Sequence, residues 1–331
     1  MAEQHADIYP WLLDYWAKLN RYLQHDRLPS ALMLHADEGL GLVELACSFA
    51  NRVCCLQPNN EGMACGQCAS CLLFNAGSYP DFYHLQPEDG KSTIRIDAIR
   101  ELSANLSLSA QYTKPRVVLI DTADAMPHQA ANSLLKTLEE PSDNTCLILI
   151  AHNLSKVPLT IRSRCQLLSL KTIDRDQACS WLELSGCQQA LEYLSLANGA
   201  PLLAQNLAQL EALDKQTALF KQLISVFKGQ LDPLLFAEAC FSHKELPVLQ
   251  WLIAWFTDAL KCAHGCSSDK LIKPSLAIEL KILTAKLELK QLHQILDKLM
   301  QLSELESTQV NQQLMFEEFA VCCYSLSLTK G

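Results

Sequence analysis

The sequence predicts an α/β domain built on a parallel sheet, then a small helical segment, then an all-helical C-terminal domain. Two short apolar runs, 117–120 and 146–150, lie one helix-length apart and each ends in polar residues, which is typical of adjacent parallel strands joined by a crossover helix. Beyond about residue 213 the chain contains helix-length amphipathic segments and no glycine-punctuated strands. A chain of 331 residues is also too long for one compact core.

Composition and charge are those of an ordinary soluble globular protein, with 49% hydrophobic and 19% charged residues. No apolar run is long enough to span a bilayer and the N-terminus lacks a signal-peptide pattern, so we expect a cytoplasmic protein. In a reducing compartment, the 15 cysteines point to buried thiols or metal ligands. The net charge of −9 argues against a dominant nucleic-acid surface, so any work near DNA would depend mainly on partners.

The first part of the chain has the layout of a phosphate-binding loop. A helical pattern at 9–27 precedes a short buried strand at 31–35. A glycine-containing turn at 36–43 follows that strand and leads into a helical pattern at 44–53. Strand, glycine turn and helix in this order direct backbone amides toward a bound phosphate.

The residues of that turn lack the chemistry of a working phosphate loop. Such a loop needs a lysine and then a serine or threonine after its last glycine, to hold phosphate and magnesium. Here Gly41 is followed by Leu42 and Val43, which can do neither. The turn with Gly39 and Gly41 is therefore either an ordinary strand-to-helix connection or a phosphate loop that has lost its function.

Cysteines between residues 54 and 72 have the spacing of a structural zinc site. Three of them form two overlapping C-x-x-C steps, and they are Cys65, Cys68 and Cys71. With one more cysteine they complete a tetrahedral site that has no open coordination position. The zinc would therefore be structural and would stabilise a small segment inserted between elements of the sheet. We favour Cys55 over Cys54 as the fourth ligand, with His84 as a distant alternative. A cluster of buried or redox-active thiols is the competing interpretation.

Polar residues follow the two apolar runs at the edge where ligands bind to parallel sheets. They are Asp121, Asp124, His152 and Asn153. An aspartate at the end of a strand can be the acid that holds magnesium or polarises water in a P-loop ATPase. A working ATPase has a second acid beside it, whereas here Thr122 follows Asp121. Taken alone, Asp121 is more simply a cap or turn residue.

The remaining elements are one strand and a series of helices. Residues 81–85 have a strand pattern, and 130–140 have a helical pattern that Pro141 stops. Further helical patterns lie at 94–108, 174–184, 188–197, 201–213, 247–261 and 287–302. Cys262, His264 and Cys266 have weak metal-ligand spacing and are interpreted as structural. Apolar faces left over in the C-terminal helices predict oligomer contacts.

Together these residues resemble the AAA+ clamp-loader subunits of bacterial DNA polymerase III over nearly the full length. The matching segments are 31–43, 55–71, IDAIR at 96–100, VLIDTAD at 118–124, NSLLKTLEEP at 132–141, SRC at 163–165 and, more weakly, VNQQL at 310–314. Residues 134–141 together with 163–165 are specific, and the cysteine module narrows the resemblance to bacterial clamp loaders. Within that family the delta-prime branch is the most similar.

The resemblance implies a fold in three parts. An AAA+ domain with a parallel five-stranded sheet would occupy residues 1–167, with the zinc module inserted at 54–72. A small helical lid would follow at 168–212, and a helical collar domain that mediates oligomerisation at 213–331. The family has one residue fewer between the first two zinc cysteines, which keeps Cys54 open as an alternative to Cys55.

The resemblance also implies a nucleotide site without function. ATP would bind at the turn with Gly39 and Gly41, where Leu42 and Val43 replace lysine and hydroxyl. Asp121 lacks its second acid, and Leu202 stands where an active lid offers an arginine. Members of the delta-prime branch generally do not hydrolyse ATP, so neither bound ATP nor ATPase activity is expected of this chain.

Arg164 has a different expected role. In the family the arginine of Ser-Arg-Cys projects across a subunit boundary and contacts the γ-phosphate that the neighbour holds. A planar, permanently charged guanidinium would stabilise negative charge in the neighbour's transition state, as an arginine finger does. A surface arginine without a role is the alternative, and Arg162 is more simply a supporting residue.

The implied partners are clamp-loader ATPase subunits of the tau or gamma type and a clamp-opening subunit of the delta type. Through them the chain would act on the sliding clamp and primer-template DNA, within the DNA-directed DNA polymerase holoenzyme, a nucleotidyltransferase complex. No membrane partner is expected. Two rivals are a clamp-loader ATPase that binds nucleotide unconventionally and a zinc-stabilised DNA-binding module, which the acidic net charge disfavours.

Overall fold

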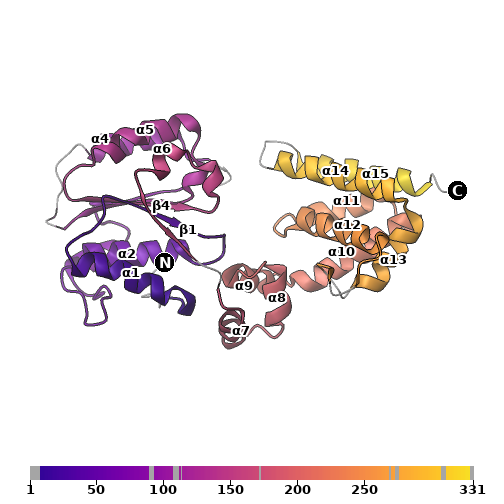
Figure 1. The fold of residues 1–331 in the computed structure, drawn as a ribbon, viewed down its shortest axis with the longest axis horizontal. Helices are drawn as coiled ribbons and strands as arrows, with labels where there is room; N and C mark the ends of the chain where they lie inside the picture. The colour runs from indigo at the N-terminus through magenta and orange to yellow at the C-terminus, as the bar shows by residue number, and fades with distance from the viewer. Residues whose placement is uncertain are drawn as a thin grey trace. The chain divides into compact units, whose positions relative to one another are not determined.

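A computed structural model describes residues 8–88, 93–106, 112, 114–170, 173–267, 270–272, 276–306 and 311–328. Its chain divides into two compact units, Met1–Asn206 and Leu207–Gly331, which Figure 1 shows as an α/β part and a helical part. The finer division into a separate lid at 168–212 stays a prediction. Among the described residues, no helix combines the length and apolar character needed to cross a bilayer.

The first unit is built on a five-stranded sheet in the order β2-β3-β4-β1-β5. The strands are β1 (Ala31–His35), β2 (Phe82–Leu85), β3 (Arg116–Ile120), β4 (Thr145–Ala151) and β5 (Gln166–Ser169). Neighbouring strands pair in parallel throughout. Strands β3 and β4 are buried along their whole length, which explains their unbroken apolar runs. The predicted parallel five-stranded sheet is confirmed.

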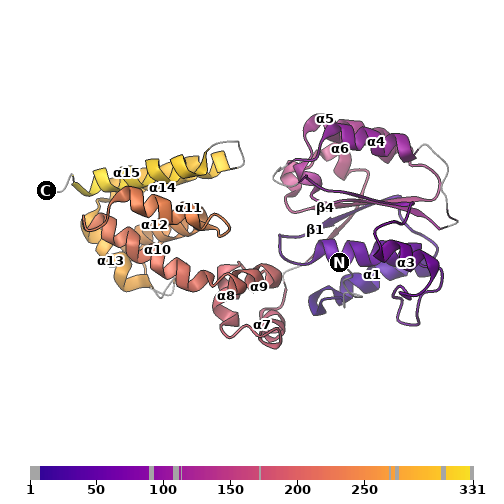
Figure 2. The same ribbon diagram turned by 180° about the vertical axis from the view of Figure 1, so that it is seen from behind.

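Helices cover both faces of this sheet. Those of the first unit are α1 (Leu13–Gln24), α2 (Leu42–Cys54), α3 (Ala69–Asn75), α4 (Ile96–Leu106), α5 (His128–Glu139), α6 (Leu159–Arg162), α7 (Arg175–Leu184), α8 (Ala190–Leu196) and α9 (Pro201–Gln209). Short 3₁₀ turns lie at η1 (Pro10–Leu12), η2 (Ala123–Ala125) and η3 (Leu154–Lys156). Helices α1, α2 and α3 lie on one face and α4, α5 and α6 on the other (Figures 1 and 2). Parallel strands joined by crossover helices require this two-sided cover.

The second unit is helical over its described residues. It consists of α10 (Ala212–Phe227), α11 (Pro233–Ser242), α12 (Val248–Ala263), α13 (Ala277–Lys286), α14 (Leu289–Glu306) and α15 (Gln312–Leu328). Aromatic side chains fill its core: the Trp255 ring lies 4.8 Å from that of Phe220, and the Phe256 ring lies 6.1 Å from that of Phe319. The predicted helical C-terminal domain is confirmed. Residues 107–111 and 307–310 lie outside the described part of the chain, so the end of the 94–108 helix and the start of VNQQL are not tested.

Two predicted helices differ from the structure in ways that the backbone makes clear. Helix α2 begins at Leu42 and not at Glu44, directly after Gly41, whose backbone is left-handed (φ 83°). The single helix predicted at 201–213 is two helices, α9 and α10. Glu211 has a φ of 51° and breaks the helical path between them.

Candidate functional site

The loop between β1 and α2 has the backbone of a phosphate loop. It leaves the sheet at His35, passes through Gly39 (φ 76°) and Gly41 (φ 83°), and enters α2. Both glycines lie in the left-handed region that side-chain-bearing residues avoid. The Leu42 side chain, where a phosphate loop has its lysine, is only 2% exposed and packs in the core. This position therefore contributes apolar packing and no cation.

Helix α9 is seated directly on this loop. The amide N–H of Leu202 donates to the carbonyl oxygen of Gly39 over 3.1 Å. A Cβ atom added at Gly39 would lie 2.8 Å from the Cβ of Leu203 and 3.0 Å from its backbone nitrogen, and the first of these is closer than real Cβ contacts. Leu202 stands where the family resemblance predicts an arginine in an active lid. It contacts the loop through its backbone N–H.

Three aromatic residues close the other side of the loop. The Trp11 indole N–H donates to the carbonyl oxygen of Leu40 over 2.9 Å. The Tyr9 and Trp11 rings are stacked at 5.1 Å, and Trp181 of α7 meets both edge-on, at 5.6 and 5.2 Å. A Cβ at Gly41 would lie 2.6 Å from the Tyr9 ring. The sequence predicted a helical pattern at 9–27, which contains Trp11, but no sequence signal linked Trp11 to Leu40 or Trp181.

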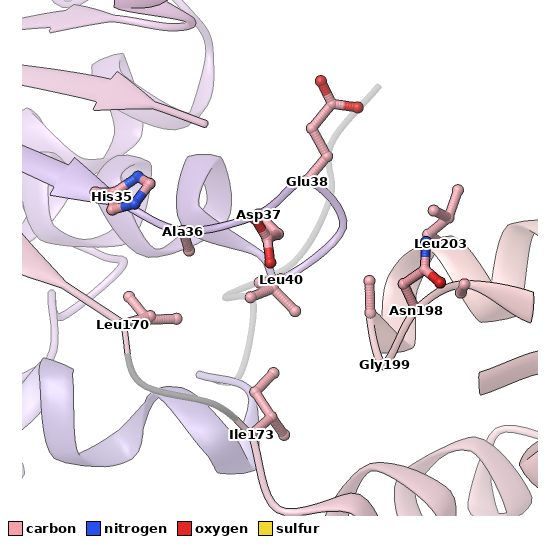
Figure 3. A pocket seen from close by; sticks show the side chains of 12 residues that line it. His35, Ala36, Asp37, Glu38, Leu40, Leu170, Ile173, Asn198, Gly199 and Leu203 are labelled. Atoms are coloured by element: carbon pink, nitrogen blue, oxygen red, sulfur yellow. The ribbon is translucent and has the colours of Figure 1, made fainter. Parts of the chain in front are cut away.

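A cavity of about 570 Å³ remains beside the loop. Its described lining includes Asp37 and Glu38 from the loop and Gly199 and Leu203 from the lid, and it contains no lysine or arginine (Figure 3). The Asp37 carboxylate points toward the cavity, whereas Glu38 extends outward. A triphosphate would therefore meet negative charge and no described cation, and close approach of like charges is unfavourable.

Two histidines tie the ends of β1 and β4 together at the same edge. His35 Nδ1 lies 2.9 Å from the carbonyl oxygen of Ala151, and His152 Nδ1 lies 2.8 Å from that of Ala36. Because a carbonyl oxygen only accepts, both rings carry a proton on Nδ1. These reciprocal bonds extend the parallel ladder by side chains, one step past the strands.

The aspartates after β3 are engaged in local structure. The Asp124 carboxylate accepts from the backbone amides of His152 and Asn153, each over 3.1 Å. Asp121 Oδ1 accepts from the Thr122 hydroxyl over 3.1 Å, and Asp121 is not among the residues lining the cavity. The structure thus brings Asp124, His152 and Asn153 together as predicted, but as a brace between β3 and β4.

Arg164 lies elsewhere, just after α6, with 35% of its side chain exposed. Its Nη1 donates to the Thr160 carbonyl oxygen over 2.8 Å and approaches the Ser163 hydroxyl at 3.5 Å. Its Nη2 lies 2.6 Å from Oε1 of Glu139, the last residue of α5. The guanidinium is thus held at the surface by α5 and α6, and its contact with Glu139 was not predicted.

The four cysteines of the predicted zinc site converge. The Sγ atoms of Cys55, Cys65, Cys68 and Cys71 all lie within 4.8 Å of one another. Tetrahedral coordination at a Zn–S distance of about 2.3 Å separates sulfurs by roughly 3.8 Å. The Cys65 and Cys71 sulfurs, 3.9 Å apart, match that spacing. The donor set and its spacing fit a zinc ion.

Backbone amides surround these sulfurs. The N–H groups of Cys65, Cys68 and Cys71 point at the sulfurs of Cys55, Cys65 and Cys68, over 3.3 to 3.5 Å. Burial raises the pKa of Cys68, but amide donation from Cys71 and Leu56 outweighs it and brings the pKa to about 6. Burial raises the pKa of Cys55 and Cys71. Four thiolates so close together need a compensating cation to coexist.

Cys54 points away from this cluster. Helix α2 ends at Cys54, and Cys55 is already extended (ψ 132°), so the two side chains leave the backbone in different directions. Burial raises the pKa of the Cys54 thiol to about 12, and the nearby Tyr79 offsets only part of that rise. The structure therefore groups Cys55, and neither Cys54 nor His84, with the other three cysteines.

The five-stranded parallel sheet and the helices on both of its faces define an α/β domain of the AAA+ class, in which a glycine-containing loop joins β1 to α2. Residues 13–174 match a family model described as "DNA polymerase III, delta subunit", and residues 210–321 match "DNA polymerase III, delta subunit, C terminal". These matches cover both the α/β part and the helical part.

Curated relatives give the more particular assignment. DNA polymerase III subunit delta' of Escherichia coli is 36% identical over 82% of this chain and 82% of its own length. The protein of the same name from Pseudomonas aeruginosa is 34% identical over 77% of this chain and 78% of its own. This chain belongs to the DNA polymerase III delta' family, and the resemblance found in the sequence is confirmed.

Among solved structures, a gamma subunit-related DNA polymerase III protein of Thermotoga maritima has a TM-score of 0.49. It is 18% identical and matches over 94% of this chain and 99% of its own. The family assignment rests on the sequence relatives.

The seating of α9 on the loop predicts unequal costs for two glycine substitutions. Gly39→Ala combines a left-handed backbone with a clash against Leu203, so we expect it to lower the free energy of unfolding by about 2–4 kcal/mol. Gly186→Ala is the matched control, since Gly186 has a φ of 88° but nothing within 4 Å of its added Cβ. It should cost about 1 kcal/mol. Urea unfolding followed by tryptophan fluorescence measures both, and equal losses would contradict the close seating.

Proposed function

We propose that this chain is a non-hydrolysing subunit of a clamp loader, in which it helps to place a sliding clamp on primed DNA. The names of its relatives support the assembly, since they are subunits of DNA polymerase III. The single observation that carries the non-hydrolysing role is the cavity beside the phosphate loop. Its described lining directs the Asp37 carboxylate toward the cavity and contains no lysine or arginine, and Leu42 is buried where a lysine would be needed.

Two further losses at the same site support this role. Thr122 stands where a working ATPase has its second acid, and the Asp121 carboxylate accepts a hydrogen bond from it. Leu202, at the position of the lid arginine, offers an apolar side chain. Phosphate binding, metal coordination and activation of the attacking water each need a charged side chain. The sequence has Leu42, Leu202 and Thr122 at the positions where the family resemblance expects such side chains. The chain then contributes to the polymerase holoenzyme without an ATPase reaction of its own.

In this proposal Arg164 acts on a neighbouring subunit. Its guanidinium is exposed, permanently charged and held by two elements, as a group that must reach a partner's phosphate should be. Leu159, five residues before it on α6, has 73% of its side chain exposed, and an apolar side chain beside a charge is typical of an interface. The neighbour would be an ATPase subunit of the tau or gamma type.

The other proposed partners follow from the same assembly. A delta-type subunit would open the clamp, and the helical C-terminal unit would join the chains in a collar. Contact with the sliding clamp and primer-template DNA would be indirect, in keeping with the net charge of −9. We also propose a cytoplasmic location, where such an assembly would work.

We further propose that Cys55, Cys65, Cys68 and Cys71 hold a structural zinc ion. The module they form has a very small apolar core, in which Ala64 joins the cysteines. A bound ion would replace that missing core by linking the ends of the segment. The module also docks on the α/β domain, since Arg52 Nε donates to the carbonyl oxygen of Gly62 over 3.1 Å. The zinc would therefore stabilise the fold and take no part in a reaction.

Replacing Arg164 tests the role in trans. In a clamp loader reconstituted with its partner subunits, Arg164→Ala should lower the DNA-stimulated ATPase rate at least tenfold, because the transition state loses a cation. Arg162→Ala is the control and should change the rate less than about twofold, since Arg162 Nη1 only approaches the Leu154 carbonyl oxygen, at 3.5 Å. An unchanged rate for Arg164→Ala would remove this role.

Two adjacent cysteines test the zinc site. Cys55→Ser should lower the zinc content of the purified chain from one ion to near none, because the site loses a thiolate. Cys54→Ser should retain the ion, since Cys54 is buried and is not among the four cysteines whose sulfurs converge. Elemental analysis after dialysis measures both contents. Loss of zinc from Cys54→Ser with retention in Cys55→Ser would reverse the assignment of the fourth ligand.

A further inference from the structure

The contact between Glu139 and Arg164 has an unusual setting. Glu139 is the last residue of α5, and Glu140 follows it as the C-cap. Carboxylates are unfavourable at this end of a helix, where the backbone carbonyls carry partial negative charge and cations are preferred. Neither residue is explained by capping, because a carboxylate cannot donate to those carbonyls. Glu139 is instead 2.6 Å from the Arg164 guanidinium.

Both partners are attached to the rigid core. Leu138, next to Glu139, is 5% exposed and belongs to the buried cluster on one face of the sheet. Ile161 belongs to the same cluster, is fully buried, and accepts the backbone N–H of Arg164 at its carbonyl oxygen over 3.0 Å. The two side chains thus extend to the surface from fixed positions 25 residues apart in the sequence.

We propose that Glu139 is a positioning residue for Arg164. This inference rests on the proposed role of Arg164 toward a neighbour's nucleotide. The Thr160 carbonyl oxygen takes a bond from Nη1 and Glu139 takes one from Nη2, so two protein acceptors fix the plane of the guanidinium. Of its five N–H donors, others remain to meet a phosphate, and 35% of the side chain stays exposed.

The energetic reason is pre-organisation. An arginine side chain without restraint samples many rotamers at the surface, and binding must offset the loss of that freedom. The ion pair with Glu139 imposes much of this restraint before the neighbour docks. Because an exposed ion pair is weak, Glu139 does not hold the guanidinium strongly enough to exclude a phosphate group with several charges.

A double-mutant cycle in the reconstituted clamp loader tests this role. The variants are Glu139→Ala, Glu139→Gln, Arg164→Ala and the double variant Glu139→Ala/Arg164→Ala, with Glu140→Ala as the matched control. The readout is the steady-state ATPase of the complex with clamp and primed DNA, resolved into kcat and the KM for ATP.

Glu139→Ala should lower kcat about threefold to tenfold with KM changed less than about twofold, because the guanidinium acts mainly in the transition state. Glu139→Gln should lie between Glu139→Ala and the unmodified protein, since its amide oxygen still accepts a hydrogen bond. Glu140→Ala should have no effect. The double variant should match Arg164→Ala, because Glu139 acts only through that arginine.

Three results would overturn the inference: an unchanged kcat in Glu139→Ala, a raised kcat, or an equal further loss when Arg164 is already replaced. A raised kcat would mean that Glu139 masks the guanidinium. If Arg164→Ala itself has no effect, the proposed function fails, which is distinct from failure of Glu139 alone. Thermal unfolding of each isolated chain checks the fold, and if Glu139→Ala does not fold, the cycle is run with Glu139→Gln.

Discussion

The seating of the lid on the loop between β1 and α2 is the constraint on which the rest of the site depends. Both contacts are made by backbone carbonyls, that of Gly39 to the Leu202 amide and that of Leu40 to the Trp11 indole. Leu203 of α9 packs against Gly39 of the loop, and the Trp11 ring that holds Leu40 also meets Trp181 of α7. Helices α7 and α9 are thereby joined to the loop by groups of the chain itself.

The same packing explains why an apolar side chain suits the start of α2. Leu42 is only 2% exposed, so it contributes to the core beside the loop. Side chains also join the strand ends, because Asp124 and the two histidines link the segments at the ends of β1, β3 and β4 by hydrogen bonds. In the proposed function, a domain braced in this way would hold Arg164 in a fixed place for a neighbour.

Much of the fold and part of the site could be predicted from the sequence. Strands β3 and β4 consist largely of unbroken apolar runs, and the cysteine spacing is local. Both patterns can therefore be recognised in the sequence without knowledge of the fold. The sequence favoured Cys55 over Cys54 but kept Cys54 as an alternative, because the choice depends on where α2 ends. The contacts of Trp11 with Leu40 and of Glu139 with Arg164 join residues 29 and 25 positions apart, and only the folded chain brings them together.

We propose that the pocket beside the loop, over its described lining, lacks the charges needed to bind ATP. Titration of ATP and magnesium into the isolated chain, followed by calorimetry, tests it most directly. We expect no saturable binding, with any Kd above about 1 mM, because the described lining directs the Asp37 carboxylate toward the pocket and offers no lysine or arginine. Saturable binding with a Kd near about 1 µM, together with release of phosphate, would contradict it.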